Sequence, residues 1–279
     1  MNFAKLHGTG NDFVLVDARD LDRDWSALAR TICDRHFGVG ADGLILAAPS
    51  EAAAVRMRIF NADGSEAEMS GNGMRCLVKF AVDDGLVAPQ GNEFEVETGA
   101  GVLSVRITKK NGKVASVRES MGPPRLDPKQ IPVDIDAPVP ITNFEVQVDG
   151  QTIPITPVSM GNPHAIYFQQ AAVAEYPLHH IGPLMEHHPL FPNRTNFEVV
   201  KFIDRRHAEM RVWERGVGET LSCGSGASAV MVASRLLDLS DNNLELHVPG
   251  GVLNLEWDGE GDVILTGPVV EVFRGMWPD

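Results

Sequence analysis

Residues 213–229, WERGVGETLSCGSGASA, place an acidic residue, an arginine, a glycine-rich turn and one cysteine directly before an apolar run. The run that follows, rich in alanine and valine, predicts a helix that is mostly buried. A helix N-terminus offers unpaired backbone N–H groups and the positive end of the helix dipole, both of which suit a carboxylate. Because Cys223 stands just before this turn, we expect its thiol pKa to lie below the usual value of about 8.5.

An earlier stretch of the chain resembles the first one. Residues 60–76 read FNADGSEAEMSGNGMRC, and at a constant offset of 153 residues Ser70 takes the position of Cys223. Matches at this offset join Arg58, Phe60, Glu66, Gly71 and Gly73 to Arg211, Trp213, Glu219, Gly224 and Gly226. At a slightly smaller offset Asn11 meets Asn162. Because the matches keep their order along the chain, the sequence predicts two similar halves in tandem.

Composition narrows the possible functions. The chain has 279 residues, of which 43% are hydrophobic and 22% charged, as in ordinary globular proteins. A formal charge of −14 without clusters of Lys and Arg argues against a nucleic-acid partner. No apolar run approaches the roughly 18 residues of a membrane span, and the first residues do not read as a signal peptide. We therefore expect a cytoplasmic protein without a membrane partner.

Cysteine and histidine spacing gives no support for a metal site or a disulfide framework. Three scattered cysteines, with no CxxC pair and no HExxH, predict neither. Four histidines lie in adjacent pairs next to prolines, and we expect them to be exposed: His179, His180, His187 and His188.

Hydrophobic periodicity and turn residues predict a mixed set of strands and helices. The expected helices cover residues 26–37 with Ser26 as N-cap, 71–82, 182–187 and the run after Cys223. Expected strands include 102–107 and 113–120, joined at Asn111-Gly112, together with 208–213, which follows an apolar run at 197–202. The proline-rich span 121–140 reads as an extended connection and a candidate domain boundary.

Two similar halves, each with a small-residue turn at a helix N-terminus, suggest a reaction type. If the halves face one ligand, they place two such groups on opposite sides of it. This is the geometry for removing a proton from one face of a carbon and returning one to the other face. The chemistry is that of a racemase or epimerase.

Seven motifs, in this order along most of the chain, resemble diaminopimelate epimerase: HGTGNDF, RHFGVGADG, FNADGSE, SGNGMRC, MGNPH, WERGVGET and CGSGA. The resemblance implies an α/β (α+β) fold of two pseudo-symmetric domains, each a curved mixed or antiparallel sheet around a central helix. It places the active site in the cleft between them. The expected halves are residues 1–122, with 267–279 possibly returning to the first half, and 123–266.

The same resemblance implies an activity and its partners. Members epimerise LL-2,6-diaminopimelate to the meso form with two bases and no cofactor, in lysine and peptidoglycan-precursor synthesis. It also implies a homodimer. The only ligand expected is the small-molecule substrate.

The site residues follow from the family pattern position by position. Cys223 matches one catalytic cysteine, and Ser70 stands where the other belongs. His164 and Glu214 match residues thought to tune the cysteine pKa values. The positions that match substrate contacts are Asn11, Asn61, Gly71, Asn72, Asn162, Asn196, Glu214, Arg215, Gly224 and Ser225. Gly43 lies where some members have a glutamine, so that contact is expected to be absent.

Ser70 decides how far the family's chemistry carries over. A hydroxyl is far less acidic than a thiol, so Ser70 is expected to be a poor anionic base and to impair two-way epimerisation. Cys76 is expected inside the helix as a buried core residue and not as a replacement. Three explanations stay open: a serine introduced to trap a complex, a natural variant with altered chemistry, and a protein that binds without turnover.

Other classes of function also fit the residues. One is a related amino-acid racemase, epimerase or dehydratase that uses a Ser/Cys pair. Another is an inactive ligand-binding homologue. A third is a cysteine-nucleophile amidohydrolase that uses Cys223 and His164. A distal pocket of Asn61, Asn196, Glu214 and Arg215 would match a second amino-acid head group and favour diaminopimelate over a simpler amino acid.

Overall fold

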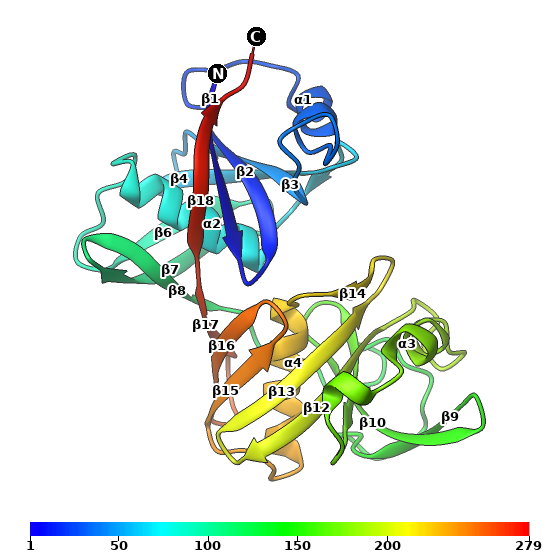
Figure 1. The fold of residues 1–279 in the computed structure, drawn as a ribbon. Helices are drawn as coiled ribbons and strands as arrows, with labels where there is room; N and C mark the ends of the chain where they lie inside the picture. The colour runs from blue at the N-terminus through cyan, green and yellow to red at the C-terminus, as the bar shows by residue number, and fades with distance from the viewer. Residues whose placement is uncertain (279) are drawn as a thin grey trace. The chain divides into compact units, whose positions relative to one another are not determined.

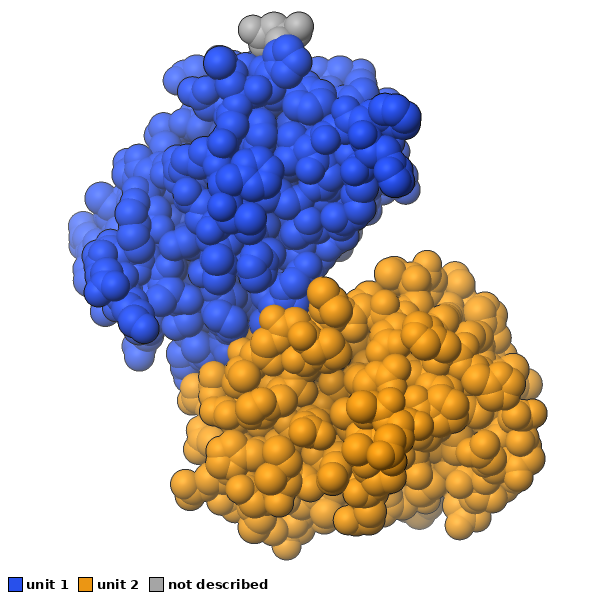
Figure 2. Space-filling model, in the orientation of Figure 1, with its two compact units in different colours: residues 1–119, 266–279 blue, residues 120–265 orange. Residues whose placement is uncertain are grey.

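The computed structural model describes residues 1–278, and the chain divides into two compact units (Figure 2). The first unit comprises residues 1–119 and 266–279, and the second comprises residues 120–265. The C-terminal segment therefore returns to the first unit, where the Met1 ammonium group donates to the Trp277 carbonyl at 2.8 Å. Figure 1 shows the two chain ends together, with β18 beside β1.

The first unit is a mixed sheet with two helices. Its elements are β1 (Asn2–Gly8), β2 (Asn11–Asp17), α1 (Trp25–Ile32), β3 (Gly43–Ala48), β4 (Val55–Asn61), β5 (Glu66–Ala67), α2 (Gly71–Asp83), β6 (Glu93–Thr98), β7 (Gly101–Lys110), β8 (Lys113–Ser120) and β18 (Val270–Met276). Along β1–β2–β3–β4–β6–β7 the pairings alternate between antiparallel and parallel, and β5 adds to β4.

The second unit repeats this pattern. Its elements are β9 (Phe144–Val148), β10 (Gln151–Ser159), β11 (Pro163–Phe168), a 3-10 turn (Val173–Glu175), α3 (Leu178–Glu186), β12 (Asn196–Asp204), β13 (His207–Glu214), β14 (Gly218–Thr220), α4 (Gly224–Leu236), β15 (Asn243–Val248) and β16 (Gly251–Glu256), and β17 (Ile264–Pro268) leads back to the first unit. Along β10–β11–β12–β13–β15–β16 the pairings alternate in the same order, with β14 added to β13. The predicted internal repeat is therefore confirmed as a repeat of topology.

The central strands of each sheet are buried on both faces, and because side chains alternate along a strand, one strand contributes to two cores. In β2, Phe13 and Leu15 join the core that contains α2, whereas Val14 and Val16 join the core that contains α1. In the second unit, α4 packs in one core and α3 lies against the other. The predicted α+β fold of two pseudo-symmetric halves, each built around a central helix, is confirmed. No helix among residues 1–278 has the length and apolarity that a membrane span requires.

Two helix predictions were wrong at their ends. Helix α1 begins at Trp25, because the Asp24 carboxylate caps it by accepting from the Ala27 N–H at 2.9 Å, while Ser26 donates to a loop carbonyl. The helix stops at Ile32, and the Asp34 carboxylate organises the next turn by accepting from two backbone N–H groups.

The other misplaced helix is α3. It starts at Leu178 rather than at the predicted residue 182, because the Pro177 carbonyl already accepts from His180 and Ile181. The four histidines in and directly after α3 were predicted to be exposed, and this is wrong for His188, which is half-buried.

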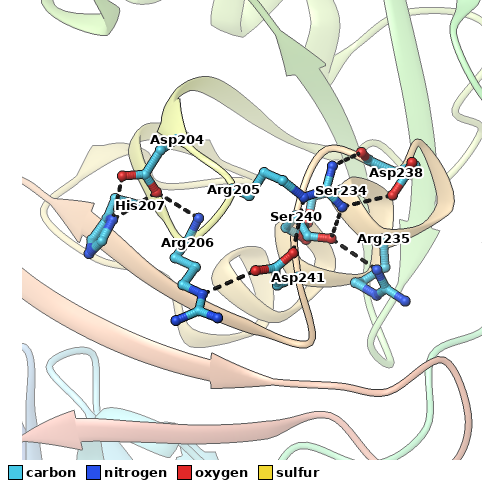
Figure 3. Close-up of polar contacts among 9 residues, drawn as sticks. All are labelled: Asp204, Arg205, Arg206, His207, Ser234, Arg235, Asp238, Ser240 and Asp241. Atoms are coloured by element: carbon cyan, nitrogen blue, oxygen red, sulfur yellow. Dashed lines mark hydrogen bonds and ion pairs between the residues drawn. The ribbon is translucent and has the colours of Figure 1, made fainter.

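A network of charged groups ties the β12–β13 turn to the end of α4 (Figure 3). Arg205 donates to the side chains of Asp238 and Asp241, and Arg206 donates to Asp241. On the same turn, Asp204 bonds to the His207 ring at 2.8 Å. These groups are largely exposed and cap the helix, so we assign them a structural role.

Candidate active site

Cys223 is the N-cap residue of α4. Its backbone is extended (φ −126°, ψ 114°), and its sulfur accepts from the Gly226 N–H at 3.4 Å. A Cβ at Gly226 would lie 2.6 Å from the Glu198 Oε1 atom and 3.3 Å from the Cys223 sulfur. Only a glycine therefore allows the thiol and the first turn of the helix to pack this closely.

Ser70 caps α2 in the same way. Its backbone is extended (φ −148°, ψ 124°), and its hydroxyl oxygen accepts from the Gly73 N–H at 3.1 Å. A Cβ at Gly73 would lie 2.9 Å from the Ile45 Cδ1 atom and 3.3 Å from the Ser70 hydroxyl oxygen. The two halves thus carry matched caps, a half-buried hydroxyl in one and a buried thiol in the other.

The electrostatics of Cys223 correct the prediction of a lowered thiol pKa. Burial raises the pKa of Cys223 well above its ordinary value, and the negative charges of Glu214 and Glu198 raise it further. Hydrogen bonds from Ser225 and Gly226 act in the opposite direction but do not outweigh burial. The thiol is therefore the resting form, and it must be deprotonated before it can act as a base.

His164 lies on β11 with no exposed side-chain surface. Its Nδ1 atom is 2.7 Å from Glu198 Oε1, and its Nε2 atom is 3.0 Å from Asn162 Oδ1. Asn162 in turn donates to the Ser225 hydroxyl at 3.3 Å, which lies 3.5 Å from the Cys223 sulfur. A continuous polar chain therefore joins a buried histidine to the thiol.

Glu198 is a residue that the sequence reasoning missed. It lies in β12 with a fully buried carboxylate, and its Oε2 atom has no hydrogen-bond partner among residues 1–278. The available signal was a lone glutamate inside the apolar run at residues 197–202. A charge on a strand buried on both faces needs a partner, and this requirement could have singled out Glu198.

Glu214 ends β13 beside the same thiol. Burial raises the pKa of the Glu214 carboxyl group, while a hydrogen bond from the Thr220 hydroxyl lowers it. The charges of Glu198 and His164 also act on Glu214, so the three ionisable groups form one electrostatic cluster with Cys223. The structure thus gathers the predicted His164, Glu214, Asn162, Ser225 and Cys223 within the second unit.

The loop after β13 is held by Asn196 and by Glu186, a second residue that the sequence reasoning missed. The Asn196 amide accepts from the Arg215 N–H at 2.9 Å and donates to a backbone carbonyl at 2.8 Å. The buried Glu186 carboxylate accepts from the Trp213 indole and the Gly216 N–H, both at 2.8 Å. Arg215 is half-buried, and its guanidinium donates to a backbone carbonyl. Substrate contacts by Asn196 and Arg215 stay predictions.

In the first unit, Asn11 and Asn72 lie together. The Asn72 amide donates to Asn11 at 3.2 Å and accepts from the guanidinium of Arg75, a fully buried residue. Arg75 forms a 3.0 Å ion pair with Glu119, whose carboxyl pKa is raised by burial to about 7. Gly71 begins α2 beside this pair, since a Cβ there would lie 3.3 Å from Glu119 Oε1.

Other predicted positions have simpler surroundings. Asn61 is exposed at the end of β4 and donates to the Ser65 hydroxyl at 3.0 Å. A Cβ at Gly43 would lie 2.7 Å from the Phe60 carbonyl oxygen, so the position has no room for a glutamine without a backbone shift. Cys76 is fully buried in the core around α2, and burial raises its thiol pKa to about 12, which agrees with its predicted core role.

Metal-ligating residues are not gathered in the described part of the chain. Among residues 1–278, no three His, Cys, Asp or Glu side chains are placed to hold a metal ion together. His179 and His180, which are exposed, lie within 2.9 Å of Glu219 and Asp149 respectively.

Solved structures of other proteins share this fold. A Bacillus anthracis phenazine biosynthesis protein of the PhzF family superposes with a TM-score of 0.70 at 19% identity, covering 99% of this chain and 98% of the other. A probable proline racemase from Agrobacterium radiobacter gives a TM-score of 0.69 at 14% identity, covering 99% and 92%. At these identities the likeness concerns the fold alone.

Sequence comparison is more specific. The family described as diaminopimelate epimerase matches residues 3–126 and 156–272. The diaminopimelate epimerase of Moorella thermoacetica is 48% identical over 281 residues, covering 100% of this chain and 99% of the relative. That of Acetivibrio thermocellus is 47% identical over 277 residues, covering 99% and 98%. Because the family model matches residues 3–126 and 156–272 and these relatives are 47–48% identical over almost the whole chain, the chain belongs to the diaminopimelate epimerase family.

Proposed function

We propose that the chain interconverts LL- and meso-2,6-diaminopimelate by moving a proton at one α-carbon, without a cofactor. The observation that carries the proposal is the pair of matched caps, in which Ser70 and Cys223 each accept from the third N–H of an equivalent helix. Membership of the family supplies the substrate. The role follows as an isomerase in lysine and peptidoglycan-precursor synthesis, and we place it in the cytoplasm.

The proposed reaction has two proton transfers. The Cys223 thiolate takes the α-proton, and the electron pair of the broken C–H bond moves into the substrate carboxylate. Backbone N–H groups at the start of a helix stabilise the charge that develops there, and Gly71, Asn72, Gly224 and Ser225 are the candidates. A proton returned to the opposite face completes inversion. In the reverse direction Cys223 donates the proton.

Ser70 makes the proposed reaction unequal on its two faces. Because its hydroxyl is a weak acid, we assign it proton donation, directly or through water, rather than proton removal. Inversion that begins with Cys223 as base is then retained better than inversion that begins on the other face. We therefore propose an epimerase whose two-way turnover is limited by Ser70.

The binding roles are proposals of the same kind. Asn11 and Asn72 in one unit and Asn162 in the other present amides near the two helix ends. For the distal amino-acid group of the substrate we propose Asn61, Asn196, Glu214 and Arg215. His164 and Glu214 would adjust the charge around Cys223.

We further propose a homodimer, and β18 supports it. The strand carries four exposed apolar side chains, and covering them would remove apolar surface from water: Val270, Val272, Phe273 and Met276. Sedimentation analysis of the protein and of Phe273→Glu tests this proposal. A protein that is monomeric at micromolar concentration would contradict it.

The activity is tested with the purified protein and LL-diaminopimelate, with no added cofactor or metal. Chiral separation of the diaminopimelate isomers should show the meso form appearing with time. Binding of diaminopimelate without any isomer change would support the non-catalytic alternative. Hydrolysis of an amide substrate with accumulation of an acyl-enzyme on Cys223 would support the amidohydrolase alternative.

A further inference from the structure

An ionisable pair is buried in the second unit where the fold does not require one. His164 and Glu198 have no exposed side-chain surface and contact each other at 2.7 Å. Burying two ionisable groups costs solvation free energy that their attraction recovers only in part. Within the described part of the chain, one Glu198 oxygen has no hydrogen-bond partner, so the pair is not an optimised structural contact.

The first unit shows what the fold accepts at these positions. Phe13 pairs with Gly43 in the parallel β2–β3 ladder as His164 pairs with Asn196 in the β11–β12 ladder. Two residues further along the partner strands, Ile45 corresponds to Glu198, and each lies against the third residue of the helix. The unit capped by Ser70 therefore fills these positions with a phenylalanine and an isoleucine, whereas the unit capped by Cys223 carries the ionisable pair.

Hydrogen bonds connect this pair to the Cys223 thiol, and the donor and acceptor of each bond can be assigned. Both nitrogens of His164 face acceptor oxygens, from Glu198 on one side and Asn162 on the other. With its carbonyl oxygen engaged, Asn162 presents its NH₂ group to the Ser225 oxygen. That leaves the Ser225 O–H free to donate to the Cys223 sulfur. A doubly protonated imidazole thus favours a sulfur that accepts, which is the thiolate.

We propose that Glu198 is a positioning residue that keeps His164 doubly protonated, so that Asn162 and Ser225 are oriented to stabilise the Cys223 thiolate. The inference rests on the proposed function, in which this thiolate is a base. Glu198 from β12 and Glu214 from β13 are the ionisable groups that interact with His164, whereas Cys223 at the start of α4 is linked to it through Asn162 and Ser225. Glu198 acts through His164 and does not touch the substrate.

The test variant is Glu198→Gln, which keeps the shape of the side chain and removes its charge. The first readout is nitrogen NMR of the His164 ring, which distinguishes one ring proton from two. The second is the pH dependence of Cys223 alkylation, followed by peptide mass spectrometry so that Cys33 and Cys76 do not interfere. Asp204→Asn, at the exposed end of β12, is the matched control.

The proposal predicts the direction in which the pH midpoint of Cys223 alkylation shifts. In Glu198→Gln, His164 should lose its second ring proton at neutral pH, and the midpoint of Cys223 alkylation should rise by about one pH unit or more. At a fixed pH below the midpoint, this is roughly a tenfold lower alkylation rate. A direct charge effect alone would lower the midpoint, because a negative neighbour is removed. An unchanged or lowered midpoint, or an unchanged His164, overturns the proposal.

A second variant covers the case in which Glu198→Gln does not fold. His164→Phe with Glu198→Ile copies the pair found in the first unit, and the proposal predicts the same rise in the alkylation midpoint. An unchanged midpoint in this folded double variant also overturns it. Neither readout needs substrate, so failure of the proposed epimerase activity would appear separately, as no turnover with an intact effect on the thiol.

Discussion

Ser70 and Cys223 occupy the same capping position of two equivalent helices, with N–H contacts of 3.1 Å and 3.4 Å to Gly73 and Gly226. The Ser70 oxygen and the Cys223 sulfur therefore accept the same hydrogen bond, but the hydroxyl and the thiol differ in acidity. Because the two side chains make the same contact, a difference in activity between the two positions reflects the acidity of the hydroxyl and the thiol. Substitutions at Ser70 or Cys223 therefore separate the contribution of each side chain to helix capping from its contribution to proton transfer.

Removing the Ser70 cap should cost stability. In Ser70→Ala the Gly73 N–H loses its acceptor, and loss of an N-cap typically costs about 1 kcal/mol. Ser70→Cys should cost less, because the sulfur of Cys223 makes the same contact in the other half. Urea unfolding of both variants checks this, and an alanine variant as stable as the parent would contradict the capping role.

The packing at Gly226 should tolerate no side chain. Gly226→Ala places a Cβ 2.6 Å from the Glu198 carboxylate, and relieving such an overlap typically costs about 1–3 kcal/mol. Gly224→Ala is the control for stability, because its Cβ would meet only Leu265 and Met121, at 3.7 Å and 3.8 Å. Thermal unfolding should rank Gly226→Ala well below Gly224→Ala.

The buried pair should show strong non-additivity. Glu198→Ile or His164→Phe alone leaves a buried polar partner uncompensated, and such single changes cost about 3–5 kcal/mol. The double variant removes both charges and should lose much less stability than the sum of the single changes. A cycle of four unfolding measurements tests this. Additive losses would show that the two groups do not interact.

Glu119 should make stability depend on pH. Burial raises the pKa of its carboxyl group from 4.5 to about 7, so between these values the folded state holds a proton that the unfolded state has lost. Stability from this group is therefore full below about pH 4.5 and falls as the pH rises toward 7, by a few kcal/mol. Urea unfolding at pH 5 and pH 7.5 should show this fall, and Glu119→Gln should reduce it. Equal slopes in the two proteins would contradict the assignment.

The sequence predicts those parts of the fold that local pattern determines. Helix α2 was predicted at residues 71–82 and spans Gly71–Asp83, because a capping residue and an apolar run mark its start and its buried face. The repeat predicted the shared topology, since equivalent positions face equivalent cores. Helix α1 was misplaced because Asp24, Ser26 and Asp34 all compete as caps, and only the tertiary contact of Ser26 decides among them.

The part of the site that sequence could not predict depends on contacts distant in the chain. The raised thiol pKa of Cys223 comes from burial and from Glu198 and Glu214, which approach it only after folding. The helix dipole alone would lower the thiol pKa, which is the opposite direction. Likewise, the contact between His164 and Glu198 joins two adjacent strands, and although His164 lies in the MGNPH motif, no quoted motif contains Glu198.

We propose that Cys223 is a working epimerase base and that Ser70 takes the position of its partner. The most direct measurement is α-deuterium uptake and isomer composition when LL-diaminopimelate is incubated in heavy water with the protein, Ser70→Cys and Cys223→Ala. Ser70→Cys should increase two-way epimerisation strongly, and Cys223→Ala should abolish it. If Ser70→Cys binds diaminopimelate yet shows no detectable epimerisation, the assignment of an epimerase activity is contradicted.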